Sequence, residues 1–169
     1  MKKFLFTMVD RIMAVLGAFI FCQIPSFMQQ YTQLLLGHLE ECKRLLATIE
    51  HNASQSNKTI LEYIQKFLTQ QDPDFVNTGL LLQNIQQRSI ELSTSYSNLQ
   101  QASLWKKPFV FLSQLDSGIF KETYSGFVPA LSFSLETIVY ALFGMVFAIM
   151  MLRLASWGCR SIFRSKKPA

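Results

Sequence analysis

The sequence lacks the short motifs that usually mark an enzyme active site or a metal centre. It has no nucleophile elbow, no glycine-rich phosphate loop and no paired-cysteine metal motif. Glycine and proline are scarce, with 7 and 5 residues in 169, and half of the residues are hydrophobic, which excludes a disordered chain. No alternating strand pattern of useful length is present. These absences predict an all-α protein that is not an enzyme and has no catalytic residues, metal site or cofactor.

The middle of the chain has little net charge. Residues 29–126 carry eight basic and nine acidic side chains, whereas residues 1–28 have a net charge of +2 and residues 127–169 of +4. A nucleic-acid-binding protein would show a basic face on its folded part, so no nucleic-acid partner is expected. Basic ends beside apolar runs instead match the positive-inside bias of membrane proteins, which makes the lipid bilayer the first expected partner.

The first long apolar run is Ile12–Met28, which only Gln23, Pro25 and Ser26 interrupt. As a helix it measures about 25 Å, slightly less than the hydrocarbon core of roughly 30 Å. A cleaved signal peptide is the alternative, because lysines precede the run, but no small-residue cleavage site follows. We therefore expect residues 1–28 to form a cytoplasmic N-terminus and an uncleaved transmembrane helix.

The second apolar run, Thr137–Leu152, contains no charged side chain and is flanked by Glu136 and Arg153. These two residues lie about 25 Å apart on a helix. They are therefore expected to mark the two ends of a second span within residues 127–157. Alternatively, the span begins at Val128 and holds Glu136 inside the bilayer, where an ionisable side chain is a functional candidate.

Both runs carry small residues at helical spacing, and such faces allow helix backbones to approach closely in lipid. The residues predicted to pack the spans together are Ala14, Gly17, Ala18, Ala141, Gly144 and Ala148.

The distribution of basic residues also predicts the topology. Both termini, including the basic tail at 158–169, should be cytoplasmic, and residues 29–126 should lie across the membrane. Cys22, Cys42 and Cys159 then fall in separate environments, so no internal disulfide is expected.

Residues 29–126 show two helical patterns separated by a turn. The first has positions seven residues apart in two series that together resemble the a/d stripe of a coiled coil, namely Met28, Leu35, Cys42, Ile49 and Tyr31, His38, Leu45, Asn52. Residues 70–79 read as the turn, with Pro73 between two aspartates and Gly79 closing it. The second pattern comprises Leu82, Ile85, Ser89, Leu92, Tyr96 and Leu99. The two helical patterns and the turn between them predict an antiparallel, coiled-coil-like helical hairpin or small bundle.

His38 and Cys42 lie four residues apart and would share one face of a helix. This spacing occurs in metal sites, but no second ligand pair is evident. Packing of both side chains in the core is therefore the preferred interpretation.

Two stretches resemble a family of small bacterial inner-membrane proteins that is classed only as a domain of unknown function. They are "QIPSFMQQYTQLLLGHLEE" at residues 23–41 and "FVPALSFSLETIVYALFG" at residues 127–144. The resemblance implies a bacterial inner-membrane location with a periplasmic domain at residues 29–126, but no activity. It selects five candidate functional or partner-contact residues, namely Gln23, Pro25, Gln30, Tyr31 and Glu136.

Three functions remain open at this stage. The leading expectation is a non-enzymatic accessory or scaffold subunit, which presents its helical domain to an envelope protein or associates with itself. A periplasmic ligand sensor that signals through a partner is the second. The third is a component of an oligomeric membrane enzyme or transporter that uses Glu136.

Overall fold

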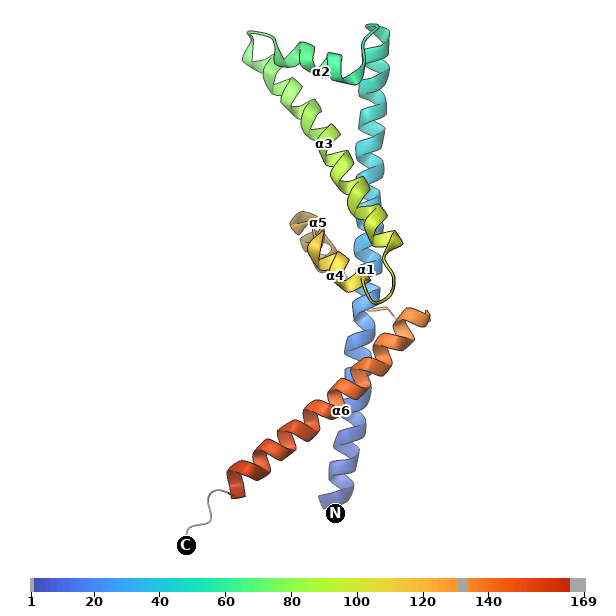
Figure 1. Cartoon of the computed structure of the whole chain (residues 1–169), viewed down its shortest axis with the longest axis vertical. Helices are drawn as coiled ribbons and strands as arrows, with labels where there is room; N and C mark the ends of the chain where they lie inside the picture. Colours follow the sequence, from blue (N-terminus) through green and yellow to red (C-terminus); the bar gives the residue numbers. More distant parts are fainter. Residues whose placement is uncertain (1, 131–133, 165–169) are drawn as a thin grey trace. The chain divides into compact units, whose positions relative to one another are not determined.

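The computed structural model describes the backbone of residues 2–130 and 134–164 and the side chains of residues 8, 11–130 and 134–154. All regular structure in this part of the chain is helical, which confirms the predicted all-α class (Figure 1). The helices are α1 (Lys2–Gln55), α2 (Ile60–Leu68), α3 (Pro73–Gln101), α4 (Lys107–Ser113), α5 (Ser117–Ser125) and α6 (Leu135–Arg164).

The chain divides into two compact units. The helix-pair unit comprises residues 1–30 and 126–169, and the inserted unit comprises residues 31–125. Helix α1 contributes to both, because it continues without a break from Lys2 to Gln55. Pro25 lies inside this helix; its ring removes one backbone N–H donor, yet the helix does not end there.

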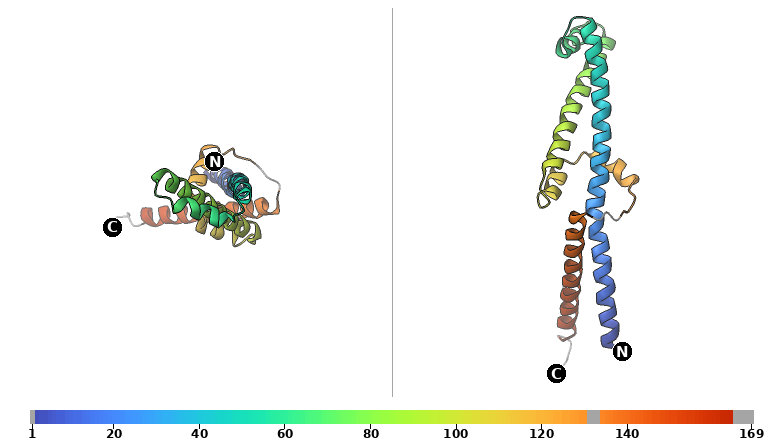
Figure 2. Two further views of the ribbon diagram at one scale, coloured as in Figure 1. Left: turned by 90° about the horizontal axis from the view of Figure 1, so that it is seen from above. Right: turned by 90° about the vertical axis from the view of Figure 1, so that its right-hand side faces the viewer.

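In the helix-pair unit, α6 crosses the first part of α1 in the antiparallel direction (Figures 1 and 2). The Phe21 ring of α1 lies between two rings of α6, with centroid distances of 6.1 Å to Phe143 and 5.5 Å to Phe147. Tilted aromatic pairs at such distances are favourable. This contact fixes the register in which the two helices meet.

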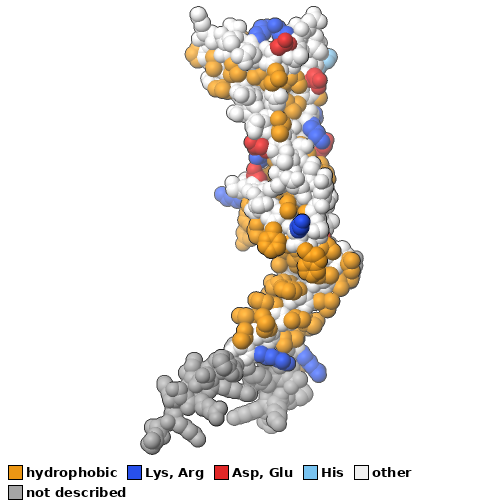
Figure 3. All heavy atoms as spheres, viewed as in Figure 1, with side chains coloured by type: hydrophobic (Ala, Val, Ile, Leu, Met, Phe, Trp, Pro, Cys, Tyr) orange, Lys and Arg blue, Asp and Glu red, His pale blue; other side chains and the backbone are white. Residues whose placement is uncertain are grey.

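Both helices of this unit are apolar on the outside. Only 11% of the apolar window in Leu135–Leu154 is buried, whereas the core helix of a soluble protein would be mostly buried. Figure 3 shows apolar side chains over the visible face of this unit, while charged groups are interspersed over the inserted unit. By length and composition, the helix that includes Arg11–Gln55 and the helix Leu135–Leu154 could each cross a membrane.

In the inserted unit, α1 ends in a backbone motif built around Asn57. This residue adopts a left-handed conformation with φ 52°, which asparagine tolerates better than most residues. The N–H of Lys58 donates to the carbonyl of Ala53 at 3.0 Å, and the N–H of Asn57 donates to that of Ser54 at 2.9 Å. Both bonds of a Schellman motif are therefore present, and they satisfy carbonyls at the helix end.

Helix α2 begins immediately afterwards with a capping box. The Thr59 hydroxyl accepts a hydrogen bond from the Glu62 N–H, and the Glu62 carboxylate accepts one from the Thr59 N–H at 2.8 Å. This exchange satisfies two otherwise unpaired donors. The bond from the Thr59 N–H also holds the pKa of Glu62 below its usual value.

The reversal of the chain differs from the turn predicted at residues 70–79. The chain reverses through α2 and its flanking turns, and α3 then runs back against the direction of α1 (Figures 1 and 2). Pro73 is the first residue of α3, capped by Asp72, because proline suits the first turn of a helix. Gly79 does not close a turn; it is buried inside α3, where an added Cβ would meet Leu68 at 2.9 Å.

One of the two seven-residue series predicted on α1 is confirmed. Met28, Leu35 and Ile49 are buried, and Cys42 is partly buried. The other series is not confirmed beyond Tyr31, because Leu45 and Asn52 are exposed. The stripe on α3 follows the prediction more closely, and Ser89, Leu92 and Leu99 are buried.

Candidate functional sites

Gln30 fastens the segment before α6 onto α1. Its amide nitrogen donates to the Val128 carbonyl at 2.7 Å, and its amide oxygen accepts from the Val128 N–H at 3.2 Å. A side-chain amide thus pairs with both polar groups of one backbone residue, as a neighbouring strand would. One turn earlier, the rings of Phe27 and Phe127 meet edge to face at 5.4 Å. Gln30 therefore positions the entry to the second apolar helix.

Tyr31 holds a different segment, within the inserted unit. Its side chain is completely buried and meets the Phe111 ring of α4 edge to face at 4.9 Å. Its hydroxyl accepts a hydrogen bond from the Asp116 N–H at 2.9 Å. Burial raises the pKa of this hydroxyl, which keeps it neutral. Tyr31 thereby joins α1 to the connection between α4 and α5.

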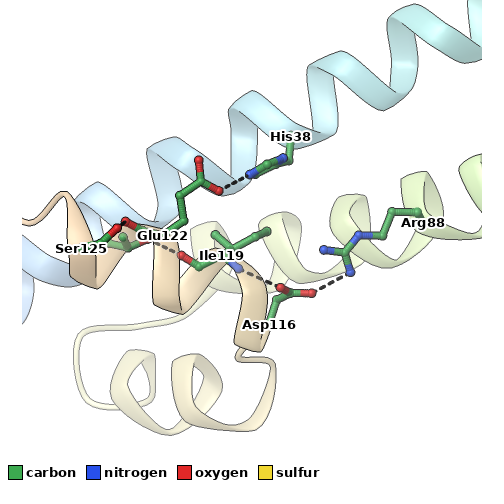
Figure 4. A network of polar contacts seen from close by, with 7 residues as sticks. His38, Arg88, Asp116, Ile119, Glu122 and Ser125 are labelled. Carbon is green, nitrogen blue, oxygen red and sulfur yellow. Dashed lines mark hydrogen bonds and ion pairs between the residues drawn. The ribbon is translucent and has the colours of Figure 1, made fainter.

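The Asp116 side chain connects α5 to α3 within the inserted unit (Figure 4). Its Oδ1 accepts from the Ile119 N–H at 2.9 Å, which caps α5, and its Oδ2 pairs with Arg88 of α3 at 2.6 Å. The hydrogen bond from Arg88 is the main cause that lowers the pKa of the Asp116 carboxyl; partial burial opposes it. The charged form of Asp116 is therefore built into the folded state.

His38 pairs with Glu122 of α5, with Nε2 3.1 Å from Oε2 (Figure 4). The His38 side chain is 43% exposed, so the preferred interpretation of His38 as a core residue was wrong. Cys42, by contrast, is partly buried. Cys42 belongs to the seven-residue series that stays on the buried face of α1, whereas the series of His38 leaves that face at Leu45 and Asn52.

The candidate residues Gln23 and Pro25 lie within the apolar part of α1. The Gln23 amide nitrogen makes local contacts only, to the Phe19 carbonyl at 3.4 Å and the Cys22 sulfur at 3.6 Å. Its amide oxygen is enclosed and has no hydrogen-bond partner in the described part of the chain. An enclosed acceptor of this kind costs about 1–3 kcal/mol. Pro25 is buried in the same stretch.

Glu136 lies in the first turn of α6. The Ser134 hydroxyl accepts from the Thr137 N–H at 3.2 Å and so caps this helix. An acidic side chain in the first turn interacts favourably with the helix dipole. Val128 belongs to the non-helical connection before α6, and the depth of Glu136 in a membrane stays a prediction.

The small residues of the two apolar helices meet at two glycines. A Cβ on Gly17 would lie 2.5 Å from the Ala148 Cβ and 2.7 Å from the Gly144 carbonyl oxygen. A Cβ on Gly144 would lie 2.6 Å from the Gly17 carbonyl oxygen. The two backbones therefore approach so closely that neither position has room for a side chain. Ala14 is also buried, while Ala18 and Ala141 are half-buried.

Metal ligands are not grouped in this part of the chain. Among the described residues, no three His, Cys, Asp or Glu side chains are placed to hold a metal ion. The side chains of residues 155–169, which include Cys159 and the predicted tail at 158–169, lie outside the described residues.

Sequence reasoning missed Arg88, Asp116 and Glu122. The capping role of Asp116 has a recognisable signal, because an aspartate precedes a short apolar helix in "DSGIF". The two ion pairs have none, since His38 and Glu122 are 84 positions apart and the partner of Arg88 lies in the connection between α4 and α5.

Two apolar antiparallel helices with a helical insertion define an all-α protein with two candidate membrane spans. The chain belongs to a family of proteins of unknown function, DUF2937, whose family model matches residues 5–165. This match confirms the resemblance to a family without an assigned activity. No curated protein matches the chain, and no solved structure matches it.

Proposed function

We propose that this protein is a non-enzymatic accessory or scaffold subunit of a bacterial inner membrane. Its two apolar helices anchor it, and residues 29–126 present a helical surface to a periplasmic envelope protein. The antiparallel arrangement of α1 and α6 supports this topology, because the start of α1 and the end of α6 lie at the same end of the pair, and basic residues accompany both in the sequence.

Large apolar side chains exposed on α2 and α3 are the observation that supports a protein partner. Leu61 of α2 is 67% exposed, and Phe75 and Leu81 of α3 are 49% and 59% exposed. The two helices already pack on one another, and the Phe67 and Phe75 rings stack at 6.1 Å. Large apolar side chains exposed on packed elements are typical of protein-binding surfaces.

The test places a photo-crosslinking amino acid at Leu61 or Phe75 of the full-length protein in its native cells. We expect one reproducible crosslinked protein at both positions, identified by mass spectrometry. Lys66 is the matched control, because it is exposed on α2 but points about 140° away from Leu61. Equal products at Lys66, or no product at Leu61 and Phe75, would contradict the proposed surface.

A groove in the inserted unit favours the sensor as a second candidate. It has a volume of about 430 Å³ and is lined by Cys42, Asn84, Ile85, Gln87, Arg88 and Glu91. Its volume falls within the range of small-molecule sites, and a few polar groups could orient a ligand there. A sensor would show ligand-dependent thermal stabilisation that the Asn84→Leu variant loses.

A further inference from the structure

Helix α4 is fixed to the turn of α1 that directly follows the first apolar run. Phe111 of α4 is buried against the ring of Tyr31, and the chain just after α4 is held by the Tyr31 hydroxyl. Tyr31 lies three residues beyond Met28 on the continuous helix α1, a rise of about 4.5 Å. The attachment point of α4 is thus within one helical turn of the predicted end of the span.

The opposite face of α4 is apolar and exposed. Phe109 is 75% exposed and Leu112 is 69% exposed, and Trp105 in the turn before the helix is 76% exposed. Phe109 lies about 200° around the helix from Phe111, so one ring is anchored while the other points away from the anchor. Helix α4 is therefore anchored to the protein by Phe111 and leaves the apolar side chains of Phe109 and Leu112 exposed.

The charges of this segment have one sign only. Residues 103–113, "SLWKKPFVFLS", contain Lys106 and Lys107 and no acidic side chain, although the rest of residues 29–126 carries an acidic excess. Tryptophan and phenylalanine favour the boundary between lipid headgroups and acyl chains, and neighbouring lysines favour anionic headgroups. Binding of another protein does not require aromatic and basic side chains to be grouped next to a membrane span. Their grouping here therefore favours lipid as the partner.

We propose that residues 105–112 form an interfacial segment, which inserts Trp105, Phe109 and Leu112 into the bilayer surface beside the first span. Lys106 and Lys107 then lie among the lipid headgroups. This inference rests on the two apolar helices crossing a membrane, and it does not depend on the accessory-subunit proposal. It gives the inserted unit a second attachment to the membrane besides the chain itself.

Tryptophan fluorescence tests the proposal with the full-length protein. The Trp157→Phe variant leaves Trp105 as the only tryptophan. It is reconstituted into vesicles of phosphatidylethanolamine and phosphatidylglycerol that carry bromine at a defined depth on the acyl chains. We expect blue-shifted Trp105 emission that is quenched most strongly by bromines near the headgroups and weakly by aqueous iodide.

Two controls in a Trp105→Phe and Trp157→Phe background separate the possible causes of failure. A tryptophan at Val146, which is exposed on α6, reports whether the spans have inserted and should be quenched by deep bromines. A tryptophan at Leu61 reports the aqueous surface and should be quenched by iodide. With the Val146 control quenched, Trp105 emission that iodide quenches and bromines do not would overturn the proposal. Protection of Trp105 from both quenchers would also overturn it, because protein rather than lipid would then cover the segment.

Discussion

At the scale of single residues, Gln30 and Tyr31 show how two neighbours on one helix organise distant parts of the chain. Gln30 pairs with the backbone 98 positions away, and Tyr31 pairs with a backbone N–H 85 positions away. The resemblance to a family was sufficient to single out both residues. Their partners could not be predicted, because a glutamine or tyrosine that binds backbone leaves no complementary side chain in the sequence.

Asp116 has the most direct pH-dependent consequence. We expect Asp116→Asn to lower the free energy of unfolding by about 1 kcal/mol near neutral pH, an estimate reduced for the partial exposure of the pair. Asparagine retains an oxygen that can cap α5 but loses the charge opposite Arg88.

The sign of the pH dependence follows from the lowered pKa of Asp116. Its ordinary value is 3.8, and the folded-state value is lower. The carboxylate therefore stabilises the fold fully above that ordinary value, and this contribution is lost as the pH falls through the folded pKa. Thermal unfolding in detergent over a descending pH series should show the gap between wild type and Asp116→Asn closing below about pH 4. A gap that stays constant over the pH series would contradict the assignment.

At the scale of elements, the end of α1 and the start of α2 were not predicted, although both follow local rules. The residues Asn57, Thr59 and Glu62 together form a helix stop and a helix start, and each follows a local rule of capping. The turn prediction failed because Pro73 and Gly79 were both taken as turn residues. Proline also begins helices, and a buried glycine also permits close packing, so only the tertiary contact with Leu68 decides between these roles.

The glycine contact between α1 and α6 can be tested by comparing two Gly→Ala substitutions on α1. Gly17→Ala should destabilise the protein by about 1–3 kcal/mol, because the added methyl group forces the helices apart. Gly37→Ala should stabilise it by about 0.5–1 kcal/mol, because alanine is the better helix former and a Cβ there meets no atom within 4 Å.

Thermal unfolding of both variants in the same detergent measures the difference, and the two midpoints should move in opposite directions. Gly144→Ala serves as a repeat on the facing helix and should resemble Gly17→Ala. An upward shift for all three variants would mean that the two helices do not approach one another at these glycines.

At the scale of the whole molecule, the all-α class and the two candidate spans followed from composition and apolar runs alone. These features depend on the sum of many residues, so single errors such as the turn predicted at residues 70–79 did not affect them. The polar contacts between helices depend on individual pairs, for which one sequence holds no information. The topology, the location and the partner stay predictions.

The predicted topology is tested by labelling cysteines in intact cells with a membrane-impermeant thiol reagent. Two single-cysteine proteins are compared, one with Ser97→Cys on the exposed surface of α3 and one that retains only Cys159. We expect the first to be labelled in intact cells and the second only after the membrane has been permeabilised. Labelling of Cys159 in intact cells would reverse the assignment of the two sides.

The hydrogen bonds between Gln30 and Val128 have a consequence for how such a chain can change over time. The inserted unit begins after residue 30 and ends before residue 126. The hydrogen bonds between Gln30 and Val128 hold the chain together close to both of these points. An insertion whose ends already meet adds little closure entropy when it is lengthened, shortened or replaced. The segment between residues 30 and 126 could therefore change in length or sequence with little effect on the helix pair, whose close contact at Gly17 and Gly144 would be kept.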